Sequence, residues 1–103
     1  MLARHNLDLC EYGDFAQILE VDELLAMFPE VSTVANIVPI RHSAIRSSSL
    51  TPPAWIDLVT KINKVTEDDP TITGIVVTHG TSSLEETAYF LHLTVKVDIP
   101  VVI

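Results

Sequence analysis

The 103-residue sequence contains little cysteine and little glycine. Its single cysteine, Cys10, cannot form a disulfide within the chain or complete a Cys-x-x-Cys metal pair. No His or Lys flanks it closely, so we expect a structural rather than a reactive thiol. Three glycines, six prolines and no internal repeat exclude the fibrous and low-complexity classes.

Basic residues are also scarce, with six Lys and Arg against 14 Asp and Glu and a net charge of -8. They form no basic stripe, so we expect no nucleic-acid partner. No apolar run approaches the roughly 20 residues that cross a bilayer, and residues 1–14 lack the apolar core of a signal peptide. We therefore expect a cytoplasmic protein with no membrane partner.

The sequence offers no metal-ligand motif. Two acidic residues, Asp68 and Asp69, follow each other in a turn that we interpret as solvated surface rather than a metal site. The four histidines are too dispersed for a motif such as H-E-x-x-H: His5, His42, His79 and His92. We expect neither a metal nor another cofactor.

Apolar spacing predicts two helices in the first two thirds of the chain. "VDELLAMF", residues 21–28, has the spacing of a short amphipathic helix that ends before Pro29. "TPPAWIDLVTKINKV", residues 51–65, begins with Thr51 as a cap and prolines in the first turn. Its predicted buried stripe consists of Trp55, Leu58, Val59 and Ile62.

A third helix is predicted over "SLEETAYFLHLTV", residues 83–95. Ser83 and Glu86 have the spacing of a capping box, and Ser82 with Glu85 offers a second register one residue earlier.

Three segments have the composition of strands. We predict one from Thr33 to Ile40, limited by Pro39, one around Ile75–Val77, and one in "IPVVI", residues 99–103. The continuous apolar run of the second predicts a parallel strand covered on both faces. The order predicts an α/β fold, an incomplete doubly wound and mainly parallel sheet flanked by helices, with all 103 residues in one partial domain.

Hydroxyl side chains collect where the second strand gives way to the third helix: Thr78, Thr81, Ser82 and Ser83. Ligands of open α/β sheets bind at this end of the strands, next to helix N-termini. On spacing alone, the favoured interpretation is that these hydroxyls cap the helix and stabilise the turn.

The order of residues adds a resemblance. "GIVVTHGTSSLEETAYFL" resembles the second signature of the bacterial-type asparaginase and glutaminase family, GIVVTHGTDTLEETAYFL, and departs from it at two positions. "VDELLAMFPEV", "AIRSSSLTPPAW" and "HLTVKVDIPVVI" are similar to further family segments. The resemblance runs from about Phe15 onward and leaves residues 1–14 poorly matched.

The resemblance implies hydrolysis of L-asparagine to L-aspartate and ammonia through a threonine nucleophile. Thr81 matches the second of two family threonines, and its implied role is to activate a nucleophile or to attack in its own right, which requires an adjacent base. Ser47 matches the serine that binds the substrate α-carboxylate, and Ser48 matches its neighbour. Ser82 replaces the aspartate that binds the α-ammonium, and a serine cannot supply that charge. Tyr12 is a further candidate, for the tyrosine of the mobile lid.

His79 lies within the motif, and imidazole is a common general base. We favour a packed, hydrogen-bonded histidine, because the family gives this position no principal catalytic role. The next residue, Gly80, is expected to permit a tight turn.

Two parts of the family's site have no match in this sequence. No TGGTI-like segment precedes residue 15. No segment after the second signature matches the family region that provides the catalytic lysine. We therefore expect a fragment of an asparaginase-like amidohydrolase, inactive in isolation, whose intact relatives form homo-oligomers. The alternative is a short α/β module that binds a small ligand or self-associates without catalysis.

Overall fold

The computed structural model describes residues 18–103. Cys10 and Tyr12 lie outside the described residues, so their predicted roles stay predictions. The chain divides into two compact units, Met1–Ile45 and Arg46–Ile103, which are described separately.

The first unit contains the predicted early helix. Helix α2 spans Val21–Ala26, and its first turn is closed by the Glu20 N–H, which donates to the Glu23 carboxylate at 2.8 Å. A 3-10 helix, η2, follows over Pro29–Thr33. The Arg41 guanidinium donates two hydrogen bonds to the Asp22 carboxylate, at 2.7 and 2.6 Å. This ion pair joins the helix to the end of the unit.

The strand predicted from Thr33 to Ile40 is wrong. Thr33 ends η2, and residues 34–40 have no regular secondary structure and are all exposed. A strand is stabilised by hydrogen bonds to a neighbouring strand. Within residues 18–103, this segment pairs with none, so its β-branched composition alone does not produce a strand.

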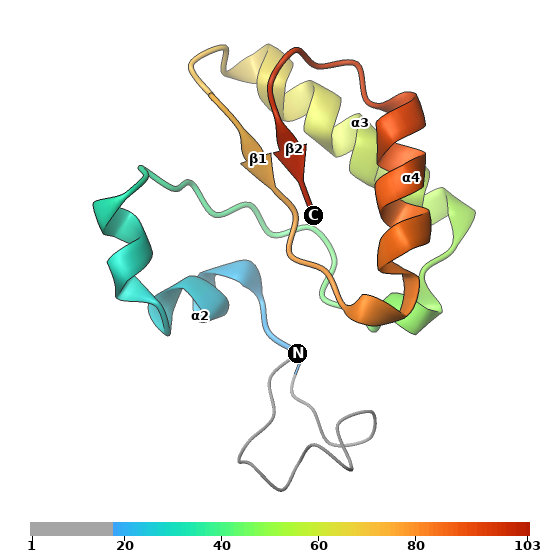
Figure 1. The fold of residues 1–103 in the computed structure, drawn as a ribbon, viewed down its shortest axis with the longest axis horizontal. Helices are drawn as coiled ribbons and strands as arrows, with labels where there is room; N and C mark the ends of the chain where they lie inside the picture. Colours follow the sequence, from blue (N-terminus) through green and yellow to red (C-terminus); the bar gives the residue numbers. More distant parts are fainter. Residues whose placement is uncertain (1–17) are drawn as a thin grey trace, which may run out of the picture. The chain divides into compact units, whose positions relative to one another are not determined.

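The second unit carries two helices and a small parallel sheet (Figure 1). Helix α3 spans Pro52–Asp68 and helix α4 spans Leu84–Thr94. Strand β1, Ile75–Val76, lies between them in sequence and pairs in parallel with β2, Val101–Val102. Helix α3 has Thr51 at its N-cap position and proline in its first turn, as predicted. The Thr51 side chain itself makes no capping hydrogen bond.

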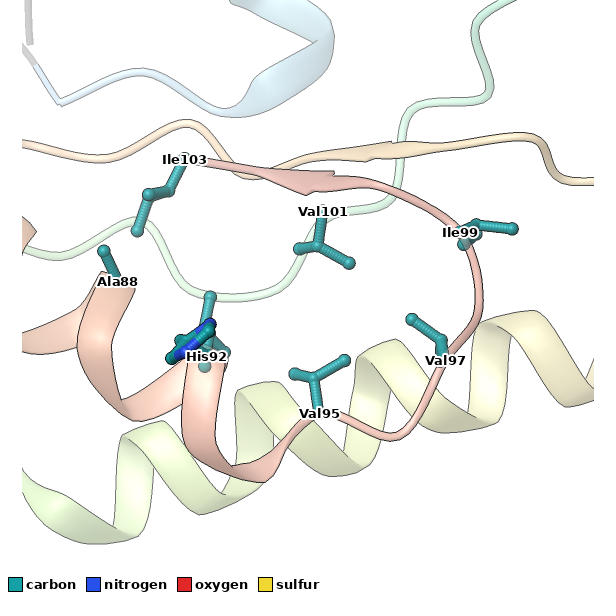
Figure 2. A pocket seen from close by; sticks show the side chains of 8 residues that line it. Ala88, His92, Val95, Val97, Ile99, Val101 and Ile103 are labelled. Atoms are coloured by element: carbon teal, nitrogen blue, oxygen red, sulfur yellow. The ribbon is translucent and has the colours of Figure 1, made fainter.

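The core of this unit lies between the helices and one face of the sheet. Ile62 of α3 and Leu91 of α4 are buried, and the rings of Trp55 and Phe90 stack with centroids 5.7 Å apart. Figure 2 shows both helices on the same side of the strands. Between α4, β2 and their connection lies a groove of about 290 Å³, lined by Ala88, Leu91, His92, Val95, Val97, Ile99, Val101 and Ile103.

The opposite face of the sheet is open in this unit. Side chains alternate along a strand, and the outward ones, Val76 and Val102, are 76% and 57% exposed. The prediction that Ile75–Val77 is covered on both faces is therefore wrong for the part of the chain that the structure describes. The parallel pairing and the flanking helices confirm the predicted α/β class with an incomplete parallel sheet.

Candidate functional site

The candidate site is built around a buried serine that precedes α3. Ser47 opens a 3-10 helix, η3, Ser47–Ser49, and is only 5% exposed. Its Oγ accepts a hydrogen bond from the Ser82 N–H at 3.3 Å, and its carbonyl oxygen accepts one from the Ser83 hydroxyl at 2.7 Å. Two segments separated by 35 residues of sequence are thus joined at one point.

Gly80 is required by this close approach rather than by a tight turn. Its φ of -85° and ψ of 159° are extended backbone that any residue adopts. A Cβ at this position would lie 2.7 Å from Ser47 Oγ and 3.3 Å from Ser47 Cβ. The expected reason for the glycine was therefore wrong, because the missing side chain makes room for Ser47.

The hydroxyl turn forms the 3-10 helix η4, Thr81–Ser83, directly before α4. Thr81 and Ser82 are exposed, as is Ser48 in η3. A hollow of about 430 Å³ opens beside the turn, lined by Thr81, Ser82, Leu84, Glu85, Ala88 and Ile103. Among these described lining residues none carries a basic side chain, and Glu85 carries the negative charge.

The predicted capping box at the start of α4 is wrong in both registers. Ser83 is the N-cap residue, but neither it nor Ser82 closes the first turn with its side chain. The Ser83 hydroxyl donates instead to the Ser47 carbonyl oxygen. A nonlocal acceptor has displaced the local one, which the spacing could not reveal.

His79 is half-buried and uses both ring nitrogens. Nδ1 lies 2.5 Å from the Gly80 carbonyl oxygen, and Nε2 lies 3.0 Å from Oγ1 of Thr87. Thr87 is fully buried and also accepts a hydrogen bond from Trp55 Nε1 at 2.9 Å. These contacts agree with the packed histidine favoured from the sequence. They also bring Thr87 into the surroundings of the site, although no sequence pattern indicated it, and they give Trp55 a polar contact.

The acidic residues at the end of α3, Asp68 and Asp69, lie at the surface. Asp68 pairs with Lys64 one helical turn earlier, with nitrogen and oxygen 2.9 Å apart. Hydrogen bonds from the hydroxyl and N–H of Thr71 hold the pKa of the Asp69 carboxyl below its ordinary value of 3.8. Residues 18–103 contain no group of three or more His, Cys, Asp or Glu side chains arranged to hold a metal ion. The helices in this range are all too short or too polar to span a membrane.

The second unit is thus an α/β fold with hydroxyl groups at the carboxyl end of a parallel strand, which is where open α/β sheets bind their ligands. The sequence profile of the family "Asparaginase, N-terminal" matches residues 9–103. The chain therefore belongs to the asparaginase family and corresponds to part of its N-terminal domain.

Individual relatives agree with this assignment. L-asparaginase 2 of Escherichia coli is 44% identical over 82 residues, which are 80% of this chain and 23% of that protein. The glutaminase-asparaginase of Acinetobacter glutaminasificans is 39% identical over 83 residues, 81% of this chain and 25% of that protein.

A solved structure, the probable cytoplasmic L-asparaginase from Campylobacter jejuni, superposes with a TM-score of 0.72 at 40% identity. The match covers 81% of this chain and 25% of that one. The chain thus spans about a quarter of the length of the relatives that it matches.

Proposed function

We propose that this chain supplies part of an amide-hydrolysing site of the L-asparaginase type, with Thr81 as the threonine nucleophile and an amino-acid amide as substrate. Thr81 is exposed in the hollow at the start of α4, where a substrate can reach its hydroxyl. A threonine hydroxyl needs an adjacent base, and the hollow's lining contains no basic residue. The family resemblance implies a lysine as this base, and the lining holds none; we therefore expect that lysine from polypeptide beyond the described residues, and little or no activity of the chain alone.

One observation supports this proposal most strongly. The serine loop and the threonine turn are the two segments that resemble the family's substrate-contacting regions, and hydrogen bonds at Ser47 hold them together. Ser47 Oγ accepts from the Ser82 N–H, which leaves its own proton available to donate to a substrate carboxylate. Ser48 and Ser82 are exposed beside it and are proposed as further substrate contacts.

Ser82 also sets the expected substrate affinity. A carboxylate at this position would give the substrate ammonium a charge-assisted hydrogen bond, roughly twice as strong as a neutral one. We therefore expect weaker binding of the α-ammonium than in a relative with aspartate, and Ser82→Asp should lower KM for asparagine.

The test has two parts. First, the purified 103-residue chain is assayed for ammonia release from asparagine and glutamine, and little or none is expected. Second, the matching segment of E. coli L-asparaginase 2 is replaced by this chain's segment. In that chimera Thr81→Val should lower kcat by at least about a thousandfold. Thr73→Val, an exposed threonine at the other end of β1, is the matched control.

Two results would contradict the proposal. Turnover near that of the relatives by the isolated chain would show that no outside base is needed. Full activity of the Thr81→Val chimera, with Thr73→Val equally active, would show that Thr81 is not the nucleophile.

A second candidate function, self-association without catalysis, is favoured by the open face of the sheet. Val76 and Val102 present exposed apolar side chains next to each other on paired strands. Apolar surface of this kind favours association. Sedimentation of the chain over a range of concentrations separates the two candidates, since a monomer at all concentrations would exclude this one.

A further inference from the structure

The buried hydroxyl of Thr87 joins three segments of the second unit. Thr87 lies in the first turn of α4 and has 0% exposure. Its Oγ1 lies 2.9 Å from Trp55 Nε1 of α3 and 3.0 Å from His79 Nε2, in the segment after β1. It also lies 2.8 Å from the carbonyl oxygen of Ser83.

The number of protons available determines the direction of these hydrogen bonds. The indole N–H of Trp55 can only donate, so Thr87 Oγ1 accepts from it. The Gly80 carbonyl oxygen can only accept, and it lies 2.5 Å from His79 Nδ1. That nitrogen must therefore carry a proton, because the other neutral tautomer would set two lone pairs against each other.

The remaining contacts depend on the state of the second ring nitrogen. In a neutral ring with its proton on Nδ1, Nε2 accepts the Thr87 proton and the Ser83 carbonyl oxygen loses the hydrogen bond from the Thr87 hydroxyl. In the imidazolium, Nε2 donates to Thr87, which then donates to Ser83, and all four contacts are satisfied. In either state the His79 Nδ1–H donates to Gly80.

We infer that Thr87 and His79 are positioning residues for Thr81, acting through the Gly80–Thr81 peptide. The peptide group is planar, so a hydrogen bond to the Gly80 carbonyl oxygen fixes the plane from which the Thr81 backbone continues. Ser47 packs against the same glycine, where a Cβ would lie only 2.7 Å from Ser47 Oγ. This inference rests on the proposed role of Thr81.

Such positioning matters because a displacement of about 1 Å at a reacting group can cost about a hundredfold in rate. The contacts also assign His79 a role other than general base. Both of its ring nitrogens are engaged, with Gly80 and with Thr87, so neither is directed to the Thr81 hydroxyl.

The proton on His79 can be observed directly in the 103-residue chain. Ring nitrogen resonances are recorded on ¹⁵N-labelled protein, and His79→Gln identifies the His79 signals among those of the four histidines. We expect a protonated Nδ1. A neutral ring with its proton on Nε2 overturns the inference. This measurement uses no activity, so it can fail while the proposed function stands.

The link to Thr81 is tested with a near-isosteric variant. Thr87→Val should shift the His79 Nε2, Trp55 indole and Thr81 amide resonances, and Thr87→Ser, which keeps the hydroxyl, should restore them. Thr94→Val is the matched control, because the Thr94 hydroxyl donates to the carbonyl oxygen four residues earlier, at 2.6 Å, as Thr87 does. It should leave all three resonances in place.

An unchanged Thr81 amide in Thr87→Val also overturns the inference. If Thr87→Val does not fold, the wild-type His79 spectrum and its preservation in Thr87→Ser decide the question. Failure of the proposed function would appear separately, as an active Thr81→Val chimera.

Discussion

Replacing Gly80 with alanine tests the contact that joins the serine loop to the threonine turn. The added methyl would meet Ser47 Oγ at 2.7 Å and Ser47 Cβ at 3.3 Å, both closer than ordinary contact. Ser47 is only 5% exposed, so the added methyl meets a side chain that is already packed. Either its hydroxyl rotates away and the Ser82 N–H loses its acceptor, or the two segments separate.

The magnitude follows from three contributions. Loss of the Ser82 to Ser47 hydrogen bond costs about 1 kcal/mol, and overpacking costs about 1 to 3 kcal/mol. Alanine at a compatible φ returns about 0.4 to 1 kcal/mol by restricting the unfolded chain, and the φ of Gly80, -85°, is compatible. We expect a net destabilisation of about 1 to 3.5 kcal/mol for Gly80→Ala.

The assay is urea unfolding of the wild type, Gly80→Ala, Ser47→Ala and the double variant. Without the Ser47 hydroxyl only the 3.3 Å approach to the Cβ of residue 47 remains, so Gly80→Ala should cost clearly less in the Ser47→Ala background. Gly74→Ala is the matched control, because a Cβ there would meet Pro100 at an ordinary 3.6 Å. An equal cost of Gly80→Ala in both backgrounds would refute the steric argument.

Three further predictions concern other contacts. The Arg41 hydrogen bonds hold the pKa of Asp22 below 3.8, so Arg41→Gln should raise it toward 3.8 in an NMR titration, and an unchanged value would contradict the pairing. Because this folded-state pKa is depressed, the stabilisation is present above pH 3.8 and is lost as pH falls through the folded value. Trp55→Phe removes the donor to the buried Thr87 hydroxyl and should lower the free energy of unfolding by about 1 to 3 kcal/mol, measured in urea; no change would show that the hydrogen bond contributes nothing. Val76→Thr should weaken any self-association seen by sedimentation, and an unchanged association would place the contact elsewhere.

The helices were predictable from sequence because their signals are local. Thr51 followed by two prolines marks the start of α3, and apolar residues at helical spacing mark its buried face. The segment from Thr33 to Ile40 shows the limit of this approach. Its composition suits a strand, but a strand exists only where another segment pairs with it, and within residues 18–103 no segment does.

The candidate site, like the fold, was only partly predictable from the sequence. Resemblance to the family indicated Ser47 and Thr81 as members of one site, and the structure brings their segments together. Spacing predicted a local cap for Ser83, whereas the observed acceptor is the carbonyl oxygen of Ser47. The role of Thr87 could not have been predicted, because no sequence pattern indicates that a threonine within a helix contacts residues as distant in sequence as Trp55.

The hydroxyl cluster that the sequence left open between a structural and a functional interpretation separates by burial. Of its four residues, Thr78 is exposed, whereas Ser83 is half-buried and its hydroxyl donates to the Ser47 carbonyl oxygen, which holds two segments together. Thr81 and Ser82 are exposed in the hollow, and the backbone of Ser82 is already anchored to Ser47. The Ser83 hydroxyl therefore holds the turn in place, and the exposed hydroxyls of Thr81 and Ser82 are available to a ligand.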